Sequence, residues 1–277
     1  MDMASQPFMR LKIRGSLKRR LSWCLHEANT LRKIASYYRR ESRLVQMERP
    51  DVLLTHYKLY HGSSAFVARR FRIPFVLWVD APASYEQRTY LREFAQIPGL
   101  AERIERLMVA MANRVIVVSE EAKGYLPLDG LRSRHIEVVP NGVDPEQFRP
   151  ALDGRGIRAQ FPVADPVVLG FVGSFAPWHG MKSLKALLAF ALSAYDNTCC
   201  LFVGDGPRRV ELEALSRSGR WNPRRVCFTS HVDHAQVPTY IAAMDVCLLP
   251  YDDQGREGFY FSPLKLFEYL ACGKAVL

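Results

Sequence analysis

Short apolar runs alternate with longer segments in which apolar residues recur every three or four positions. The short runs predict buried strands and the longer segments predict helices. Strands are expected at 51–55, 74–79, 115–118, 136–139, 167–172, 199–203, 226–229, 246–249 and 275–277. Helices are expected at 63–72, 88–113, 182–195, 208–216, 235–244 and 264–272. Strands that alternate with helices in this way favour parallel sheets with right-handed crossover connections.

The alternation divides into two similar halves of an α/β protein. Residues 48–150 are expected to form one Rossmann-like domain with a parallel sheet, and residues 166–277 a second one facing it. Residues 151–165 are rich in Pro, Gly and charged residues and are expected to be a linker. The turn signal Pro140-Asn141-Gly142 follows the last strand of the first half.

Residues 1–47 differ from the rest because they carry 11 Lys or Arg against 3 Asp or Glu, a net charge of +8 out of +10. From about residue 16 to 46 the apolar spacing predicts one or two helices. A basic helical segment suits an anionic membrane surface, an expected partner. The alternative, that the helix packs on a sheet with a solvated charged face, is the one we favour. Nothing here resembles a nucleic-acid recognition module, so no nucleic-acid partner is expected.

One stretch, residues 259–277, combines strong helix signals with two charges. Ser262 suits an N-cap, Pro263 suits the first helical position, and Gly273 suits the left-handed residue after the helix. Lys265 and Glu268 lie three residues apart and share a helix face. A phosphate at the helix start would meet backbone N–H groups and the Lys265 ammonium, while Glu268 could accept hydrogen bonds from a ribose diol. The alternative is a surface ion pair.

The sequence Ser-Pro-Leu-Lys-Leu-Phe-Glu-Tyr-Leu-Ala-Cys-Gly-Lys-Ala-Val resembles the nucleotide-sugar motif of retaining GT-B glycosyltransferases of family 4. The resemblance covers roughly residues 50–277 and implies a GT-B fold, with two Rossmann-like domains facing a cleft. It assigns Glu268 to the donor ribose. Many family members carry a second Glu where this chain has Tyr260. By the family's pattern both domains are incomplete, and we expect a truncated chain with weak or no turnover.

The loop between Gly173 and Gly180 follows the first strand of the second half, where open parallel sheets bind ligands. In the family this loop carries an Arg and a Lys aimed at the diphosphate, and those positions are Ser174 and His179 here. The resemblance places Val232 beside the nucleotide base. Gly204-Asp205-Gly206-Pro207 resembles a family turn that we expect to be structural. Expected donor-binding residues are Gly173, Ser174, Gly180, Val232, Ser262, Leu264, Lys265 and Glu268.

The expected catalytic residues are Asp80, His179 and Lys265. Asp80 ends an apolar strand of the first half, where it would either orient an acceptor hydroxyl or cap a turn. His56 and His61 follow the preceding strand and are weaker candidates. The sequence contains no Asp-x-Asp motif beside a strand, and the GT-B fold implies no metal and no cofactor beyond the sugar nucleotide. Asp252-Asp253 is expected to be a solvated loop pair.

Composition limits the remaining choices. The six cysteines form no C-x-x-C pair, which fits a reducing cytoplasm, and no segment reaches the ~18 apolar residues of a membrane-spanning helix. Together with the resemblance to family 4, this implies a cytoplasmic glycosyltransferase, which would be peripheral at the inner membrane face if the basic helix lies on a membrane. It would move a sugar with retention from a nucleoside diphosphate to a hydroxyl of a glycan, lipid-linked or small-molecule acceptor, in cell-surface glycan or glycoconjugate synthesis. The alternative is a non-catalytic fragment that binds a sugar nucleotide or a partner. The absent third glycine, replaced by Arg209, disfavours a nicotinamide oxidoreductase.

Overall fold

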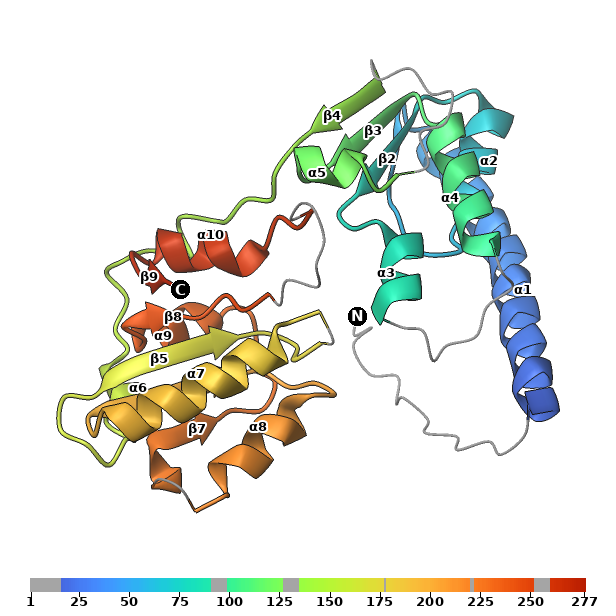
Figure 1. Cartoon of the computed structure of the whole chain (residues 1–277). Coiled ribbons are helices and arrows are strands. Elements are labelled where there is room, and N and C mark those ends of the chain that lie inside the picture. The colour runs from blue at the N-terminus through green and yellow to red at the C-terminus, as the bar shows by residue number, and fades with distance from the viewer. Residues whose placement is uncertain (1–15, 91–98, 127–134, 177, 220–221, 252–259) are drawn as a thin grey trace. The chain divides into compact units, whose positions relative to one another are not determined.

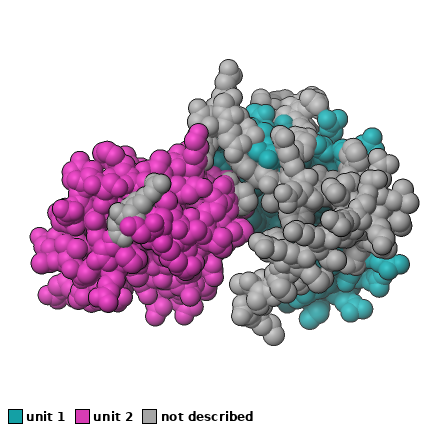
Figure 2. Space-filling model, turned by 60° about the horizontal axis from the view of Figure 1, so that its bottom comes forward, with its two compact units in different colours: residues 1–139, 259–261 teal, residues 140–258, 262–277 magenta. Residues whose placement is uncertain are grey.

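The structure is a computed structural model that describes residues 16–90, 99–126, 135–176, 178–219, 222–251 and 260–277 (Figure 1). The chain forms two compact units, coloured separately in Figure 2. The first contains residues 1–139 and 259–261, and the second contains residues 140–258 and 262–277. Tyr260 and Phe261 therefore pack with the first unit although they lie near the end of the chain.

The first unit is built on a parallel sheet of four strands in the order β1-β2-β3-β4. The strands are β1 (Leu53–His56), β2 (Phe75–Val79), β3 (Arg114–Val117) and β4 (Ile136–Val138). Its helices are α1 (Ser16–Glu48), α2 (Ser63–Phe71), α3 (Ala83–Tyr90), α4 (Leu100–Met111) and α5 (Glu120–Lys123). The long helix α1 runs beside α2 in Figure 1.

The core of the first unit lies on one face of this sheet. In β2, Phe75, Leu77 and Val79 are buried, whereas Trp78 between them remains 37% exposed. The buried set packs against Met108 and other apolar residues of α2 and α4. The period of two in burial is that of a strand with one covered face.

The second unit contains a parallel sheet in the order β7-β6-β5-β8-β9. The strands are β5 (Val167–Val172), β6 (Thr198–Val203), β7 (Val226–Phe228), β8 (Val246–Cys247) and β9 (Ala275–Val276). The helices are α6 (Arg155–Arg158), α7 (Met181–Ala194), α8 (Arg209–Ser216), α9 (Val237–Ala242) and α10 (Leu264–Ala271), with one 3-10 turn, η2 (Pro223–Arg225). Two parallel-sheet units confirm the predicted α/β class.

Both faces of the second sheet are covered. All six residues of β6 are buried, and the last five, 199–203, belong alternately to two clusters. Leu201 and Val203 pack in a cluster with side chains of α9 and α10, whereas Cys200 and Phe202 pack in another with side chains of α7 and α8. Helices on both faces of a parallel sheet give the three-layer arrangement of doubly wound α/β units.

Two expectations differ from the structure. The helix expected at 88–113 is replaced by α3 and α4, and residues 91–98 between them lie outside the described part. Pro98 and Gly99 account for the new start, because Gly99 takes a φ of 76° and α4 begins directly after it. Residues 151–165 belong to the second unit and include α6, whose Arg158 donates to Ala243 O and Asp245 Oδ2.

Candidate functional site

The second unit brings several loop ends together where β5 and β6 end and α10 begins. Gly204 follows β6 with a φ of 117°, and a Cβ there would lie 2.3 Å from Gly173 O. A Cβ on Gly206 would lie 1.5 Å from Ser174 O. The Gly204–Gly206 turn therefore packs backbone against backbone on the loop after β5, which supports its structural role. Carboxyl ends of strands in open α/β sheets are where ligands bind.

The start of α10 differs in detail from the prediction. The N-cap residue is Pro263 and not Ser262, and no side chain caps the helix. Ser262 instead accepts from Asn141 N through its hydroxyl, at 3.0 Å, and Asn141 Nδ2 donates to Ser262 O. The capping expectation fails because Asn141, more than a hundred residues earlier, occupies the hydroxyl. The expected left-handed Gly273 is confirmed, with a φ of 69°.

Because no side chain caps α10, its first amides remain available. The N–H groups of Leu264 and Lys265 donate to no described residue, whereas that of Leu266 donates to Pro263 O. Free N–H groups and the helix dipole favour an anion at this end of a helix. The expected approach of a phosphate to this helix start is therefore chemically supported.

Lys265 projects from this helix start toward the loop after β5. Its Nζ lies 2.9 Å from His179 Nε2 and 4.4 Å from the centroid of the Phe171 ring. A Cβ on Gly173 would lie 2.7 Å from Nζ, so glycine at 173 makes room for the amine. Two residues predicted from separate motifs, His179 and Lys265, are thus in direct contact.

The hydrogen bonds of His179 bear on the protonation state of Lys265. Ala176 N donates to His179 Nδ1 at 3.2 Å, which makes Nδ1 the acceptor of the neutral ring and leaves the proton on Nε2. In that tautomer Nε2–H faces Lys265 Nζ and donates to it when the amine is neutral. Burial lowers the pKa of Lys265 to about 7, against the opposing charge of Glu268. Burial and then the Lys265 charge lower the pKa of His179 to about 3.

Glu268, one turn further along α10, has a different partner. Its Oε1 lies 2.9 Å from His234 Nε2, and its side chain is 12% exposed while that of His234 is 66% exposed. No ion pair joins Lys265 and Glu268 among the described residues, so the simple surface pair is not what forms. A carboxylate with one histidine partner retains acceptor capacity for a diol.

The loop between β5 and α7 uses its two predicted glycines internally. Gly173 N donates to Val203 O and Gly180 N donates to Pro250 O, both at 2.9 Å. The N–H groups of Ser174 and Phe175 donate to no described residue. Amides at 174 and 175 are therefore better placed to meet a phosphate than those at 173 and 180.

The predicted donor-binding residues Val232 and Leu264 differ in their exposure to solvent. Val232 is partly buried against the core cluster that contains Tyr269, and Leu264 is exposed. Tyr269 Oη accepts from Val172 N at 2.9 Å and so ties α10 to the end of β5. His234 is largely exposed, and no sequence signal links it to Glu268, which lies 34 residues later.

Asp80 lies in the first unit, whereas the other predicted site residues lie in the second. Its Oδ1 is 2.9 Å from His56 Nε2, and both side chains are partly exposed at the ends of β1 and β2. Nearby in the chain, Glu86 accepts from Tyr260 Oη at 3.0 Å. Burial raises the pKa of Glu86 to about 7, with a smaller contribution from Asp80 and against the Tyr260 hydrogen bond.

Among the described residues no group of three or more His, Cys, Asp or Glu is arranged to hold a metal ion. The described helices also include none that is long and apolar enough to cross a membrane. Asp252 and Asp253 lie outside the described residues.

The chain is similar to many known proteins. It is 30% identical to 2-deoxystreptamine glucosyltransferase of Streptomyces kanamyceticus over 155 residues, and 31% identical to the putative teichuronic acid biosynthesis glycosyltransferase TuaH of Bacillus subtilis over 150 residues. These matches cover 54% and 51% of the chain but only 40% and 34% of the relatives. The matched segments thus span less than half of each relative.

Solved structures extend the likeness across both units. The Anabaena protein HepE in complex with UDP matches with a TM-score of 0.66 and 22% identity, covering 88% of this chain and 62% of that one. Sucrose-phosphate synthase from Thermosynechococcus elongatus matches with a TM-score of 0.66 and 21% identity, covering 88% of this chain and 59% of that one. At these identities the likeness establishes the fold, which is that of GT-B glycosyltransferases.

Family models account for both halves of the sequence. Residues 12–147 match the model of Glycosyltransferase Family 4, and residues 166–277 match that of Glycosyl transferases group 1. The motif at 259–277 and the two parallel-sheet units agree with these matches. The chain belongs to family 4 of the glycosyltransferases, the glycosyl transferases group 1, and has the GT-B fold.

Proposed function

We propose that this chain forms the donor-binding part of an enzyme that moves a sugar from a nucleoside diphosphate to a hydroxyl acceptor with retention. The observation that carries the proposal is the start of α10. There Lys265 and Glu268 lie one turn apart, beside free helix amides, and each contacts a histidine instead of the other. A cation with N–H donors suits a diphosphate, and a carboxylate suits a ribose diol.

The proposed donor is a uridine diphosphate sugar. HepE, which shares the fold, is known in complex with UDP-glucose. In our proposal the diphosphate lies against Lys265, the α10 amides and the amides at 174 and 175, while Glu268 accepts from the ribose hydroxyls. Val232 borders the base, and Ser262 and Leu264 shape the helix start.

The proposed chemistry is displacement at the anomeric carbon. The bond from that carbon to the diphosphate oxygen breaks, and a bond to the acceptor oxygen forms on the same face through an oxocarbenium-like state, while the acceptor hydroxyl passes its proton to the departing diphosphate oxygen. Lys265 and the free amides stabilise charge on the departing diphosphate, and His179 positions Lys265. Asp80, held by His56, orients the acceptor hydroxyl. Acceptors would be glycans, lipid-linked sugars or small molecules, in cytoplasmic synthesis of cell-surface glycans or glycoconjugates.

Calorimetric titration with UDP-glucose tests the donor site. We expect Glu268→Ala to weaken binding about 10- to 100-fold, because a hydrogen bond to a charged group contributes about 1.5–3 kcal/mol. Glu146→Ala is the matched control, since Glu146 is an exposed carboxylate of the same unit, and it should bind normally. Equal affinity for all three proteins would remove the support for this site.

Turnover separates the enzyme from the competing function, a non-catalytic fragment that binds the donor or a partner. Release of UDP with transfer to an acceptor, with the product anomer identified by NMR, would support the enzyme. Donor binding without hydrolysis or transfer would favour the non-catalytic fragment. Binding of NAD without binding of any sugar nucleotide would contradict both.

A further inference from the structure

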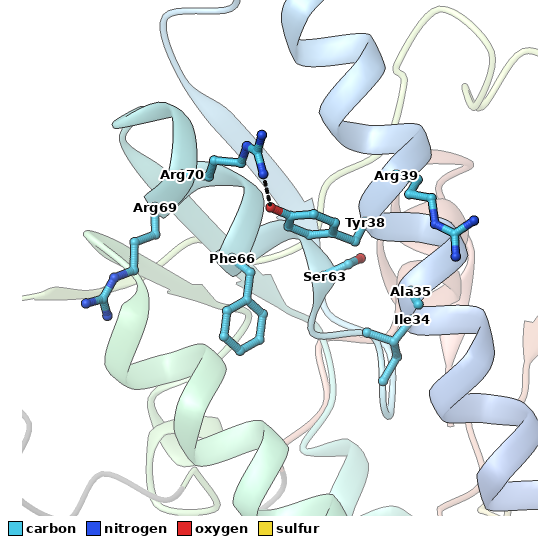
Figure 3. Close-up of a pocket in the computed structure, with 8 residues that line it drawn as sticks. All are labelled: Ile34, Ala35, Tyr38, Arg39, Ser63, Phe66, Arg69 and Arg70. Carbon is cyan, nitrogen blue, oxygen red and sulfur yellow. Dashed lines mark hydrogen bonds between the residues drawn. The ribbon is translucent and has the colours of Figure 1, made fainter.

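A groove of about 760 Å³ lies between α1 and α2 in the first unit, remote in sequence from the predicted donor residues (Figure 3). From α1 it is lined by Ile34, Ala35, Tyr38 and Arg39, and from α2 and its start by Ser63, Phe66, Arg69 and Arg70. Neither the donor site nor Asp80 uses any of these residues. The groove is therefore a feature of this chain that the proposed function leaves unexplained.

The lining is cationic and lacks any acidic residue. The side chains of Arg39 and Arg69 are exposed and have no hydrogen bond or ion pair to any described residue. Arg70 Nη1 donates to Tyr38 Oη at 3.4 Å. Because the tyrosine hydroxyl is neutral, this contact leaves the charge of Arg70 uncompensated. Three arginines without a carboxylate partner create a positive field that attracts anions.

Exposed apolar side chains accompany these charges. Phe66 is 45% exposed in the groove, and Ile34 is partly exposed beside it. Along α1, Arg32 and Arg43 lie seven residues before and four after Arg39, so the three arginines follow one side of the helix. Of the α1 side chains described from Arg32 onward, only Val45 is buried. One side of α1 packs on α2, and the rest faces outward.

The arrangement of the arginines distinguishes a surface from a single-anion pocket. In Figure 3 the guanidinium groups of Arg39 and Arg69 point away from each other, to opposite sides of the groove. One phosphate could not be gripped by both, whereas separate phospholipid headgroups could each meet one. Aromatic and aliphatic groups between basic residues are the composition of segments that lie at a membrane interface.

We propose that the α1–α2 groove is a docking surface for a membrane that contains anionic phospholipids. The arginines contact headgroup phosphates, and Phe66 and Ile34 face the acyl boundary. The sequence left open whether the basic helix packs or binds a membrane, and in this proposal it does both, because the α1 residues that line the groove also border its packing on α2. The inference does not depend on the proposed transferase activity, because lipid binding is measured without donor or acceptor.

Flotation of the full chain with vesicles tests the proposal. We expect binding to vesicles of mixed phosphatidylglycerol and phosphatidylcholine, little binding to pure phosphatidylcholine, and weaker binding as salt rises. Each basic residue near an anionic surface contributes about fivefold in affinity. The triple variant Arg39→Gln, Arg69→Gln, Arg70→Gln should therefore bind on the order of 100-fold more weakly, with unchanged circular dichroism.

A control removes the same charge elsewhere. Arg103, Lys182 and Arg224 are exposed, and their side chains have no ion pair to a described residue. Changing these three to Gln should leave most of the vesicle binding intact. If this control loses as much binding as the groove variant, the net charge and not the groove is responsible, and the proposal is overturned.

Two further arms exclude other ligands. Inorganic phosphate should compete no better than chloride at equal ionic strength, and selective displacement by phosphate would assign the groove to a soluble anion. A duplex DNA oligonucleotide should bind more weakly than anionic vesicles at moderate salt. Equal or tighter DNA binding that the groove variant abolishes would overturn the membrane assignment.

Discussion

The two sheets of this protein are both parallel, yet their side chains meet different surroundings. In the second unit, successive residues of β6 are buried alternately under helices on opposite faces. In the first unit, Leu77 of β2 is fully buried whereas the next residue, Trp78, is 37% exposed. Leu54 of β1 is also exposed. Parallel sheets are usually covered on both faces, so the second unit is the more completely enclosed of the two.

This difference bears on how each unit supports its candidate residues. The second unit fixes the start of α10 through buried contacts such as Tyr269 Oη with Val172 N, so the positions of Lys265 and Glu268 follow from a packed core. In the first unit, His56 and Asp80 contact each other at a partly exposed edge of the sheet. A rigid support is what positioning of a donor requires.

The largest expected effects compare neighbouring residues within each sheet. Leu201→Ala should lower the free energy of unfolding by about 2–5 kcal/mol, and Phe202→Ala by about 3–5 kcal/mol, because both leave cavities in enclosed cores. Leu77→Ala should cost as much as Leu201→Ala, but Leu54→Ala only about 1 kcal/mol, since more than half of that side chain already contacts water. Urea denaturation followed by circular dichroism measures all four.

The outcome for Leu54 decides the comparison. A loss for Leu54→Ala that equals that of Leu77→Ala would indicate that both faces of the first sheet are enclosed. The two units would then not differ in the way described above.

An intermediate effect concerns Glu86 of the first unit. Burial raises the pKa of Glu86 from the usual 4.5 to about 7. Between these two pH values the Glu86 carboxyl is therefore protonated in the folded protein and ionised in the unfolded chain. Stability from this group is therefore present at low pH and is lost as pH rises from about 4.5 through 7. We expect Glu86→Gln to remove about 2 kcal/mol of that pH dependence, measured by urea denaturation at pH 5 and pH 8.

Glu120→Gln is the control for this prediction, because Glu120 is an exposed carboxylate in the same unit. It should keep the dependence of the unmodified protein. A Glu86→Gln variant whose stability follows pH as the unmodified protein does would show that the Glu86 carboxyl titrates normally.

The smallest expected effect concerns Lys265 of the second unit. Burial keeps Glu86 neutral by raising its pKa, and it favours neutral Lys265 by lowering the pKa of the amine. His179, Glu268 and, beyond the His179 ring, Tyr251 are the ionisable groups around its amine. Because the free amine has a pKa of about 7, a bound diphosphate must add a proton to it above that pH. Affinity for UDP-glucose should be nearly constant below pH 7 and fall above it, becoming roughly 20-fold weaker at pH 8.5 than at pH 6.5.

Arginine at this position separates protonation from other causes. Lys265→Arg carries a permanent charge, so its affinity for UDP-glucose should vary little over the same range. Lys182→Arg, an exposed site on α7, should keep the pH dependence. A pH profile that is the same for Lys265→Arg and the unmodified protein would mean that Lys265 does not take up the proton.

The sequence by itself determined the class of the fold and the family. Apolar runs with a period of two or of 3.6 depend only on neighbouring residues, so the strands and most helices were predictable from local pattern. The motif around Lys265 and Glu268 likewise lies within one helix turn. The prediction of one helix at 88–113 was wrong in extent. It followed the apolar spacing and ignored Pro98 and Gly99, two residues that typically interrupt a helix.

Only the tertiary structure decided which partner each site residue has. Contacts such as Lys265 with His179, Glu268 with His234 and Ser262 with Asn141 join residues 34 to 121 positions apart. No local pattern specifies such a pair, because the two side chains meet only after the sheet and its crossovers bring the loops together. The same long-range packing surrounds Lys265 and lowers the pKa of its amine to about 7.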